Sequence, residues 1–235
     1  MAVSEGNEPD FGHDLADSRL LQRRIRVGLH HSGYLKMRVG GIVLCGGESR
    51  RMGRPKALLP FGLETMLQRV ASTLQEQLSP VVVVGAPGQD MPQLDPGLLT
   101  VSDPTPGRGP VQGVASGLEA LDVVDAAFVC SCDLPLLTSS FVSFLSERAS
   151  VDSIIVPEIG GRMQPLCAVY PKRAHLALQQ MIEDSCFRLT DVTERFPTHV
   201  IAEEEFLEVD PELRCFTNVN SVKTYKRALR LAGVN

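Results

Sequence analysis

The chain has 235 residues, of which 43% are hydrophobic and 22% charged, a balance that is ordinary for a soluble globular protein. Its net charge of −5 argues against a chain-wide positive field for nucleic acid, and no apolar run reaches the roughly 18 residues of a membrane span. The acidic, polar start lacks the apolar segment of a secretory signal, so we expect a cytoplasmic protein without a membrane partner.

Residues 1–38 precede the first convincing strand, and their first part is acidic and poor in apolar residues. We expect an N-terminal extension that is disordered or weakly helical. A second reading, in which Met37 is the native start, stays open. Residues 39–235 are then expected to form a single domain.

From residue 40 onward, apolar runs of strand length alternate with segments of helical period. Strands are expected at 41–45, 81–84, 98–101, 126–130, 153–156, 165–170 and 198–202. Helices are expected at 65–78, 111–121, 139–149, 173–183, 188–195 and 221–231. This alternation predicts an α/β protein: a three-layer, Rossmann-like fold with a mainly parallel sheet and helices on both faces.

The six cysteines contain no CxxC pair, and most of them lie inside apolar runs. They are Cys45, Cys130, Cys132, Cys167, Cys186 and Cys215. Reduced, buried thiols are the favoured interpretation over disulfides.

Polar loops follow three of the predicted strands, at 46–56, 102–110 and 131–135. Ligands of parallel α/β sheets bind beyond the carboxyl ends of the strands. We therefore expect these three loops to open onto one edge of the sheet.

The first loop combines a glycine pair, Gly46 and Gly47, with four cations. The cations are Arg50, Arg51, Arg54 and Lys56. Glycines let backbone N–H groups approach phosphate oxygens, and cations neutralise them. The loop is neither a Walker A loop, because alanine follows the lysine, nor a G-x-G-x-x-G dinucleotide motif. A solvated basic turn is the alternative.

The pattern GGxSxRMGxxK in this loop resembles the nucleotide-binding signature of the NTP-transferase family that includes the molybdenum cofactor guanylyltransferases. The resemblance covers about residues 40–232, because later motifs follow in the same order. It implies nucleotide contacts for Leu44, Cys45, Gly46, Gly47, Gly53 and Lys56, with Arg51 and Lys56 acting in catalysis. Pro55 and Cys45 depart from the common residues of the family, but neither change removes a phosphate-binding group.

The second loop carries Asp103, followed by Gly109, Pro110 and Gly113, and it resembles the nucleoside-binding segment of the family. A carboxylate can accept a hydrogen bond from guanine or from a ribose hydroxyl. Alternatively, the Asp-Pro and Pro-Gly pairs simply form turns.

The third loop places Asp133 directly after a strand, where one carboxylate can hold Mg²⁺ together with substrate phosphates and water. The family has a metal-binding aspartate in the matching CD-x-P motif. An aspartate that only caps a turn before Pro135 is the alternative. Cys130 and Cys132 lack the further ligands of a thiolate metal site.

Two later segments resemble the acceptor-binding motifs of the family: Gln164 with Pro165, and Asn218 with Asn220. Asn218 and Asn220 are two positions apart, so on an extended backbone both side chains point to the same face. Asn220 could instead cap the last helix.

The resemblance implies transfer of GMP from GTP to the terminal phosphate of molybdopterin, which releases pyrophosphate and forms molybdopterin guanine dinucleotide. It also implies Mg²⁺ as cofactor, a nucleotide half at about 40–135 and an acceptor half at about 136–232. A monomer is expected, with transient contacts to molybdenum cofactor insertion proteins or molybdoenzymes. A cytidylyltransferase of the same fold and a non-catalytic cofactor-binding protein are the alternatives.

Overall fold

The computed structural model describes residues 37–46, 55–105 and 107–234, which all belong to one compact unit, Leu35–Asn235. The expected N-terminal extension lies outside the described residues, apart from its last two positions.

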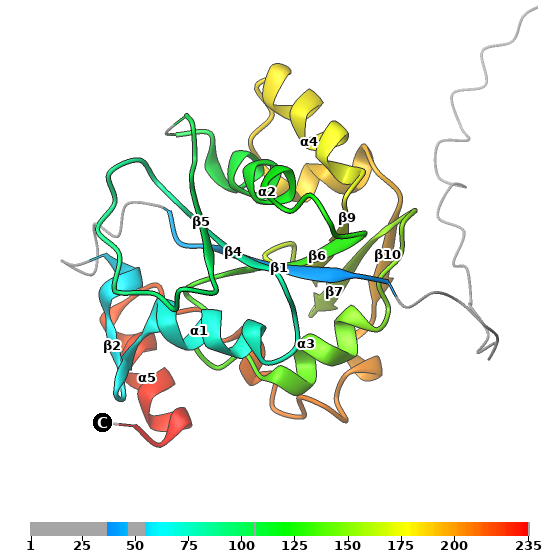
Figure 1. The fold of residues 1–235 in the computed structure, drawn as a ribbon. Coiled ribbons are helices and arrows are strands. Elements are labelled where there is room, and N and C mark those ends of the chain that lie inside the picture. The colour runs from blue at the N-terminus through cyan, green and yellow to red at the C-terminus, as the bar shows by residue number, and fades with distance from the viewer. Residues whose placement is uncertain (1–36, 47–54, 106, 235) are drawn as a thin grey trace, which may run out of the picture. The chain divides into compact units, whose positions relative to one another are not determined.

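An eight-stranded sheet forms the centre of the described part of the chain (Figure 1). Its strands are β1 (Val39–Leu44), β4 (Val81–Gly85), β5 (Leu99–Ser102), β6 (Ala126–Ser131), β7 (Ile154–Ile159), β8 (Arg162–Met163), β9 (Cys167–Pro171) and β10 (Thr198–Ile201). Their order is β10-β7-β9-β6-β1-β4-β5, and β8 pairs with β7. Strands β6, β1, β4 and β5 are parallel to one another, whereas β9 runs antiparallel to both β6 and β7. The expected mainly parallel sheet is confirmed.

Helices cover both faces of the sheet because successive strand residues point to opposite sides. The helices are α1 (Met66–Gln75), α2 (Gly109–Ala120), α3 (Ser139–Ser146), α4 (Ala174–Glu183) and α5 (Val222–Ala232). Val43 packs in one core with α1 and α3, and Ile42 packs in the other core with α2 and α4. Figure 1 shows these two helix pairs on opposite sides of the sheet. The predicted three-layer arrangement is therefore confirmed.

Helix α2 lies close to β1 because glycines face the strand. A Cβ atom on Gly117 would stand 2.6 Å from Ile42, and one on Gly113 would stand 3.2 Å from Leu44. Packing therefore explains Gly113, the last residue of the nucleoside-binding resemblance, without a ligand.

A short hairpin was not predicted from the sequence. Strands β2 (Pro60–Phe61) and β3 (Glu64–Thr65) are only two residues long, too short for an alternating pattern to be visible. Gly62, with φ 69°, makes the turn between them. Together with α5 they enclose a third small core around Phe61, Met66 and Val219. This core fixes the C-terminal segment to the rest of the fold.

Most predicted elements differ from the observed ones only by a few residues at their ends, as α1 and α3 do, and one differs in kind. The predicted helix 188–195 is a 3₁₀ helix, Leu189–Glu194. The strand predicted at 165–170 begins at Cys167, because Gln164 accepts a hydrogen bond from the Cys167 N–H and closes a turn before it.

The cysteines behave as expected: all six are free thiols, and all except Cys186 are buried. No helix among the described residues has the length and apolar character needed to cross a membrane.

Helix α2 ends without a glycine cap, and the side chain of Lys172 satisfies its last carbonyl groups instead. Its ammonium group donates hydrogen bonds to the carbonyl oxygens of Leu118 and, at 2.8 Å, Leu121. These carbonyls belong to the last turn of α2, where unpaired C=O groups and the helix dipole attract a cation. Lys172 thereby connects α2 to the residues that precede α4.

We predict that Lys172→Met lowers the free energy of unfolding by about 1–2 kcal/mol, because the aliphatic chain remains while the charged donor is lost. Urea denaturation measures the change. Lys223→Met, at an exposed position of α5, is the control and should alter stability by less than about 0.5 kcal/mol. Equal effects of the two substitutions would contradict the capping role.

Candidate active site

The three predicted loops begin at one edge of the sheet, because β1, β5 and β6 are parallel and each loop follows a carboxyl end. Along this edge, Gly46 follows β1, Asp103 follows β5 and Asp133 follows β6. The strand order therefore separates Asp133 from Asp103 by the ends of β1 and β4.

Part of the first loop lies outside the described residues. This applies to three residues predicted to bind nucleotide or to act in catalysis: Gly47, Arg51 and Gly53. Their roles stay predictions. The described start of the loop, Gly46, has space around its Cα: an added Cβ would come no closer than 3.5 Å to the Ala86 nitrogen. Packing among the described residues therefore does not require glycine at this position.

Cys45 is tied into the sheet through its backbone. Its N–H donates to the carbonyl of Val84 at 2.9 Å, and its carbonyl accepts from the side-chain amide of Gln89 at 2.8 Å. Both backbone groups of Cys45 are therefore paired within the protein, and its predicted nucleotide contact stays a prediction. No described residue accepts a hydrogen bond from the Gly46 N–H, which leaves that group as the first donor of the loop. The neighbouring Leu44 points into the core beside α2.

Lys56 is held at the edge by its neighbours. It begins a short 3₁₀ helix, Lys56–Leu58, directly after Pro55. Ala57 is completely buried and anchors this turn to the core. The Lys56 ammonium group donates to Asp133 Oδ2 at 3.0 Å and to Asn220 Oδ1.

Asp133 is fixed by both its neighbours and its backbone. Cys132 and Leu134 on either side are buried, and the Cys132 N–H donates to the Leu44 carbonyl at 2.9 Å. The Asp133 carbonyl accepts from the Val219 N–H, also at 2.9 Å. Its side chain is 13% exposed. While Oδ2 pairs with Lys56, Oδ1 is buried and lacks a hydrogen-bond partner among the described residues.

The C-terminal segment brings Asn220 into this group. The cap of α5 is Ser221, whose hydroxyl accepts from the Thr224 N–H at 3.1 Å, so Asn220 is not the cap. Val219 is buried, whereas Asn218 and Asn220 are exposed, as expected for an extended stretch. Asn220 accepts a hydrogen bond from Lys56, whereas Asn218 has no side-chain hydrogen bond to Lys56 or Asp133 among the described residues.

The residues present fit a magnesium ion. A buried carboxylate oxygen without a partner is an unsatisfied acceptor, which is costly unless a cation or donor meets it. Asp133 and Asn220 both offer oxygen atoms, which are the ligands Mg²⁺ prefers, and the ion commonly takes its other ligands from phosphates and water. No group of three or more His, Cys, Asp or Glu side chains suited to a metal exists in the described part of the chain. The donors therefore suit Mg²⁺ bound jointly with a phosphate rather than a closed protein site.

Asp103 lies at the β5 end of this edge, where β5 is the last strand of the sheet. Its N–H donates to the Gly85 carbonyl at 2.8 Å, and its side chain accepts from the Thr105 N–H at 3.1 Å. Burial raises the pKa of its carboxyl above the usual 3.8, and the Thr105 N–H and the charge of Arg108 partly offset this rise. The predicted turn at Asp103 is therefore present, and the carboxylate is only partly satisfied by it.

Gly109 and Pro110 have roles that the backbone explains. Gly109 has φ 63°, a conformation that favours glycine, and Pro110 lies in the first turn of α2, where proline needs no N–H partner. Their assignment to nucleotide binding stays a prediction.

Gln164 and Pro165 lie on the other side of Asp133. The residue pair Cys130 and Cys167 joins the end of β6 to the start of antiparallel β9. The turn at Gln164 that precedes β9 is therefore at the same sheet edge as Asp133. The Gln164 side chain donates to the Arg162 carbonyl at 3.0 Å, and the Pro165 carbonyl accepts from the Tyr170 hydroxyl at 2.9 Å.

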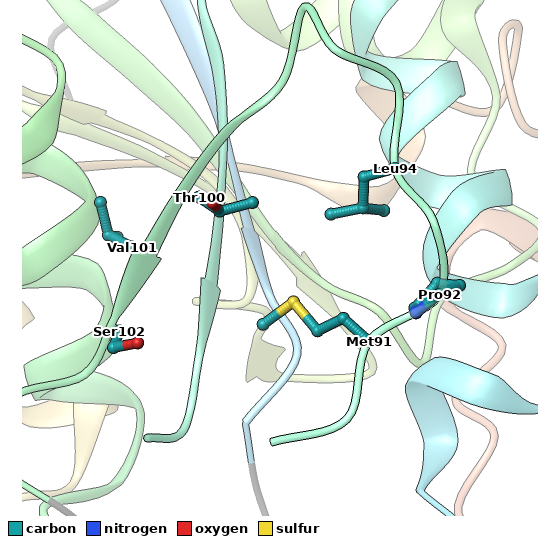
Figure 2. Close-up of a pocket in the computed structure, with 6 residues that line it drawn as sticks. All are labelled: Met91, Pro92, Leu94, Thr100, Val101 and Ser102. Atoms are coloured by element: carbon teal, nitrogen blue, oxygen red, sulfur yellow. The ribbon is translucent and has the colours of Figure 1, made fainter. Parts of the chain in front are cut away.

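A hollow of about 360 Å³ lies beside β5. In Figure 2, Thr100 extends from β5 toward Leu94 and Met91 of the preceding loop, whereas Val101 points away. Strands β4 and β1 lie between β5 and β6, so the hollow borders the Asp103 side of the edge and not Asp133.

Gln89, which was not predicted from the sequence, links two strand ends. Its Nε2 donates to the Cys45 carbonyl at 2.8 Å, and its Oε1 accepts from the Ala86 N–H at 3.1 Å. The available signal was a polar side chain directly after a Pro-Gly turn at the end of the buried strand β4.

Residues 41–197 match the family model of the MobA-like NTP transferase domain. A Mycobacterium tuberculosis protein named "Probable molybdenum cofactor guanylyltransferase" is 38% identical over 189 residues, which cover 78% of this chain and 89% of the relative. A protein of the same name from Pelotomaculum thermopropionicum is 32% identical over 196 residues, which cover 82% of this chain and 92% of the relative.

Solved structures share the fold. Molybdopterin-guanine dinucleotide biosynthesis protein A from Archaeoglobus fulgidus aligns with a TM-score of 0.69 at 21% identity, covering 83% of this chain and 98% of that chain. The 2-C-methyl-D-erythritol 4-phosphate cytidylyltransferase from Thermus thermophilus aligns with a TM-score of 0.63 at 18% identity, covering 84% and 100%. At these identities the likeness concerns the fold alone. From the family model and the two relatives in sequence, the chain belongs to the MobA-like NTP transferase family.

Proposed function

We propose that the protein transfers GMP from GTP to the terminal phosphate of molybdopterin, releasing pyrophosphate and forming molybdopterin guanine dinucleotide. The names of the two relatives support this choice of substrates. The structural observation that carries the proposal is the meeting of Lys56, Asp133 and Asn220 in the middle of the sheet edge.

The order of groups along the edge fits a nucleotide on one side and an acceptor on the other. Asp103 is three strand positions from Asp133, a distance of about 14 Å at the usual strand spacing. An extended nucleoside triphosphate can cover that length, with its phosphates at Lys56. Gln164 lies one strand beyond Asp133, so an acceptor phosphate held there would approach the α-phosphorus from the other side.

Lys56 and the Gly46 N–H have the chemistry to hold the phosphates. The Gly46 N–H follows the end of β1, and the Lys56 ammonium group lies beside Asp133. Bound phosphates would give Lys56 new acceptors and would leave the Asp133 carboxylate to a cation. Arg51 is the further cation that we expect at the leaving pyrophosphate.

The reaction needs no general base from the protein. The second pKa of a phosphate monoester is about 6, so the acceptor is mostly dianionic at neutral pH. Its oxygen forms the new bond to the α-phosphorus, and the bond to the β-phosphate oxygen breaks as pyrophosphate leaves with the electron pair. The nearby thiols are unsuited to nucleophilic attack, because burial raises the pKa of Cys45 to about 12 and that of Cys132 well above 9.0. Catalysis then depends on positioning and on charge stabilisation.

Mg²⁺, held through oxygens of Asp133 and Asn220, would neutralise phosphate charge when bound. The protein contributes the fixed carboxylate, since the Val219 and Cys132 hydrogen bonds hold the backbone on both sides of it.

We predict that Asp133→Ala lowers Mg²⁺-dependent pyrophosphate release from GTP and molybdopterin by at least about a hundredfold, because a charge contact to the reacting phosphates is lost. Asp122→Ala is the matched control, since this exposed aspartate precedes the opposite end of β6. Near-normal turnover in a folded Asp133→Ala protein would remove the metal assignment.

Base choice is tested by pyrophosphate release with GTP and with CTP, each with molybdopterin and Mg²⁺. We expect a clear preference for GTP. A preference for CTP would establish the cytidylyltransferase alternative, which the shared fold also supports. GTP binding without pyrophosphate release in the presence of the acceptor would indicate a non-catalytic binding protein.

The variant Asp103→Asn distinguishes a role of Asp103 in nucleoside binding from a role in the stability of the fold. A carboxyl whose pKa is raised on folding costs stability in its ionised form, so the wild type loses stability as pH rises from 3.8 through the raised pKa. The amide keeps the acceptor for the Thr105 N–H but does not ionise. We therefore expect the variant to be at least as stable as the wild type at pH 7 and less active in GTP turnover.

Urea unfolding between about pH 4 and pH 7, with pyrophosphate release measured in parallel, checks both expectations. If the variant is less stable than the wild type and loses activity only in proportion to its loss of folded protein, Asp103 is a structural turn residue.

A further inference from the structure

The side-chain amide of Gln89 makes hydrogen bonds to two backbone groups at the sheet edge. It donates to the Cys45 carbonyl at the end of β1 and accepts from the Ala86 N–H at the end of β4. A single planar group thus satisfies an acceptor and a donor that belong to neighbouring parallel strands.

This pair of backbone groups lies where the proposed function puts the nucleoside. A Cβ on Gly46 would be 3.5 Å from the Ala86 nitrogen, and the Gly85 carbonyl accepts from the Asp103 N–H at 2.8 Å. Cys45 and Ala86, at the ends of β1 and β4, therefore lie between Asp133 and Asp103 along the edge. A nucleotide with its phosphates at Lys56 and its nucleoside toward Asp103 must cross this position.

The base of GTP carries the same hydrogen-bonding pattern as the glutamine side chain. In the lactam edge of guanine, the carbonyl O6 adjoins the N1–H in one plane, just as Oε1 adjoins the Nε2–H group in a primary carboxamide. Guanine can therefore offer O6 to the Ala86 N–H and N1–H to the Cys45 carbonyl. Both backbone groups stay satisfied when one amide replaces the other.

The local backbone allows Gln89 to leave. Pro87 and Gly88 form an exposed turn in which the Gln89 N–H donates to the Ala86 carbonyl at 3.1 Å. Gly88 has φ 68°, as the third position of a Pro-Gly type II turn requires. Gln89 itself is only partly buried, so its side chain can rotate into solvent without opening the core.

We propose that Gln89 is an internal substitute for the guanine lactam: it holds the Cys45 carbonyl and the Ala86 N–H in the empty protein, and the base of GTP displaces it. The proposal rests on the proposed function. Gln89 then lowers the affinity for nucleotides and requires an incoming base to offer an acceptor beside a donor.

The test compares equilibrium binding to the wild type, Gln89→Ala and Gln89→Met by calorimetry, with GTP, O6-methyl-GTP and tripolyphosphate as ligands. Removing the competing amide should tighten GTP binding by roughly tenfold, the equivalent of about one net hydrogen bond. Tripolyphosphate, which has no base, and O6-methyl-GTP, which lacks the N1–H donor, should bind both variants as they bind the wild type. Gln93→Ala, at an exposed position of the same loop, should change nothing.

The outcomes separate this proposal from the proposed function. Unchanged or weaker GTP binding by Gln89→Ala and Gln89→Met, with normal pyrophosphate release by the wild type, overturns the Gln89 proposal alone. An equal gain for all three ligands also overturns it, because it shows a general opening of the site. If neither the wild type nor the variants bind GTP while tripolyphosphate binds, both proposals fail.

Discussion

The position of one ammonium group connects the parts of this site. Lys56 comes from the segment after β1, Asp133 from the end of β6 and Asn220 from the extended stretch before α5, and the lysine donates a hydrogen bond to an oxygen of each of the other two. Each segment is held by its own buried neighbours: Ala57 next to Lys56, Cys132 next to Asp133 and Val219 next to Asn220. The ammonium group balances the negative charge of the Asp133 carboxylate and satisfies the neutral amide oxygen of Asn220. The same arrangement can therefore exchange one cation for another without moving the backbone.

Much of the fold was predictable because its signals are local. The run from Ile42 to Cys45 is apolar on both faces, as a strand between two helix layers requires, and its alternate residues do enter the two cores. The direction of parallel strands then forces the loops after β1, β5 and β6 onto one edge. The placement of Gly46, Asp103 and Asp133 followed from this rule and not from any property of the individual residues.

What the sequence could not provide depends on distant partners. Lys56 and Asn220 are 164 positions apart, and no periodic pattern relates them. Asn220 had an alternative local interpretation as a helix cap, which was wrong because the serine after it makes that bond. Gln89 was overlooked because its two partners are backbone groups, which every residue possesses. The roles of Arg51 and Gly53 stay predictions, since they lie outside the described residues.

The reversed direction of β9 has a consequence for how new acceptor preferences could arise. Because β9 starts at the edge where its neighbour β6 ends, the residues beside Asp133 on this side belong to a hairpin-like excursion, β7 to β9, and not to a strand-to-helix loop. Such an excursion can change in length or composition while β1, β4 and β5 keep their register. The fold thereby separates the part proposed to meet the acceptor from the part proposed to hold the nucleotide, a modularity that would let one scaffold serve several acceptor chemistries.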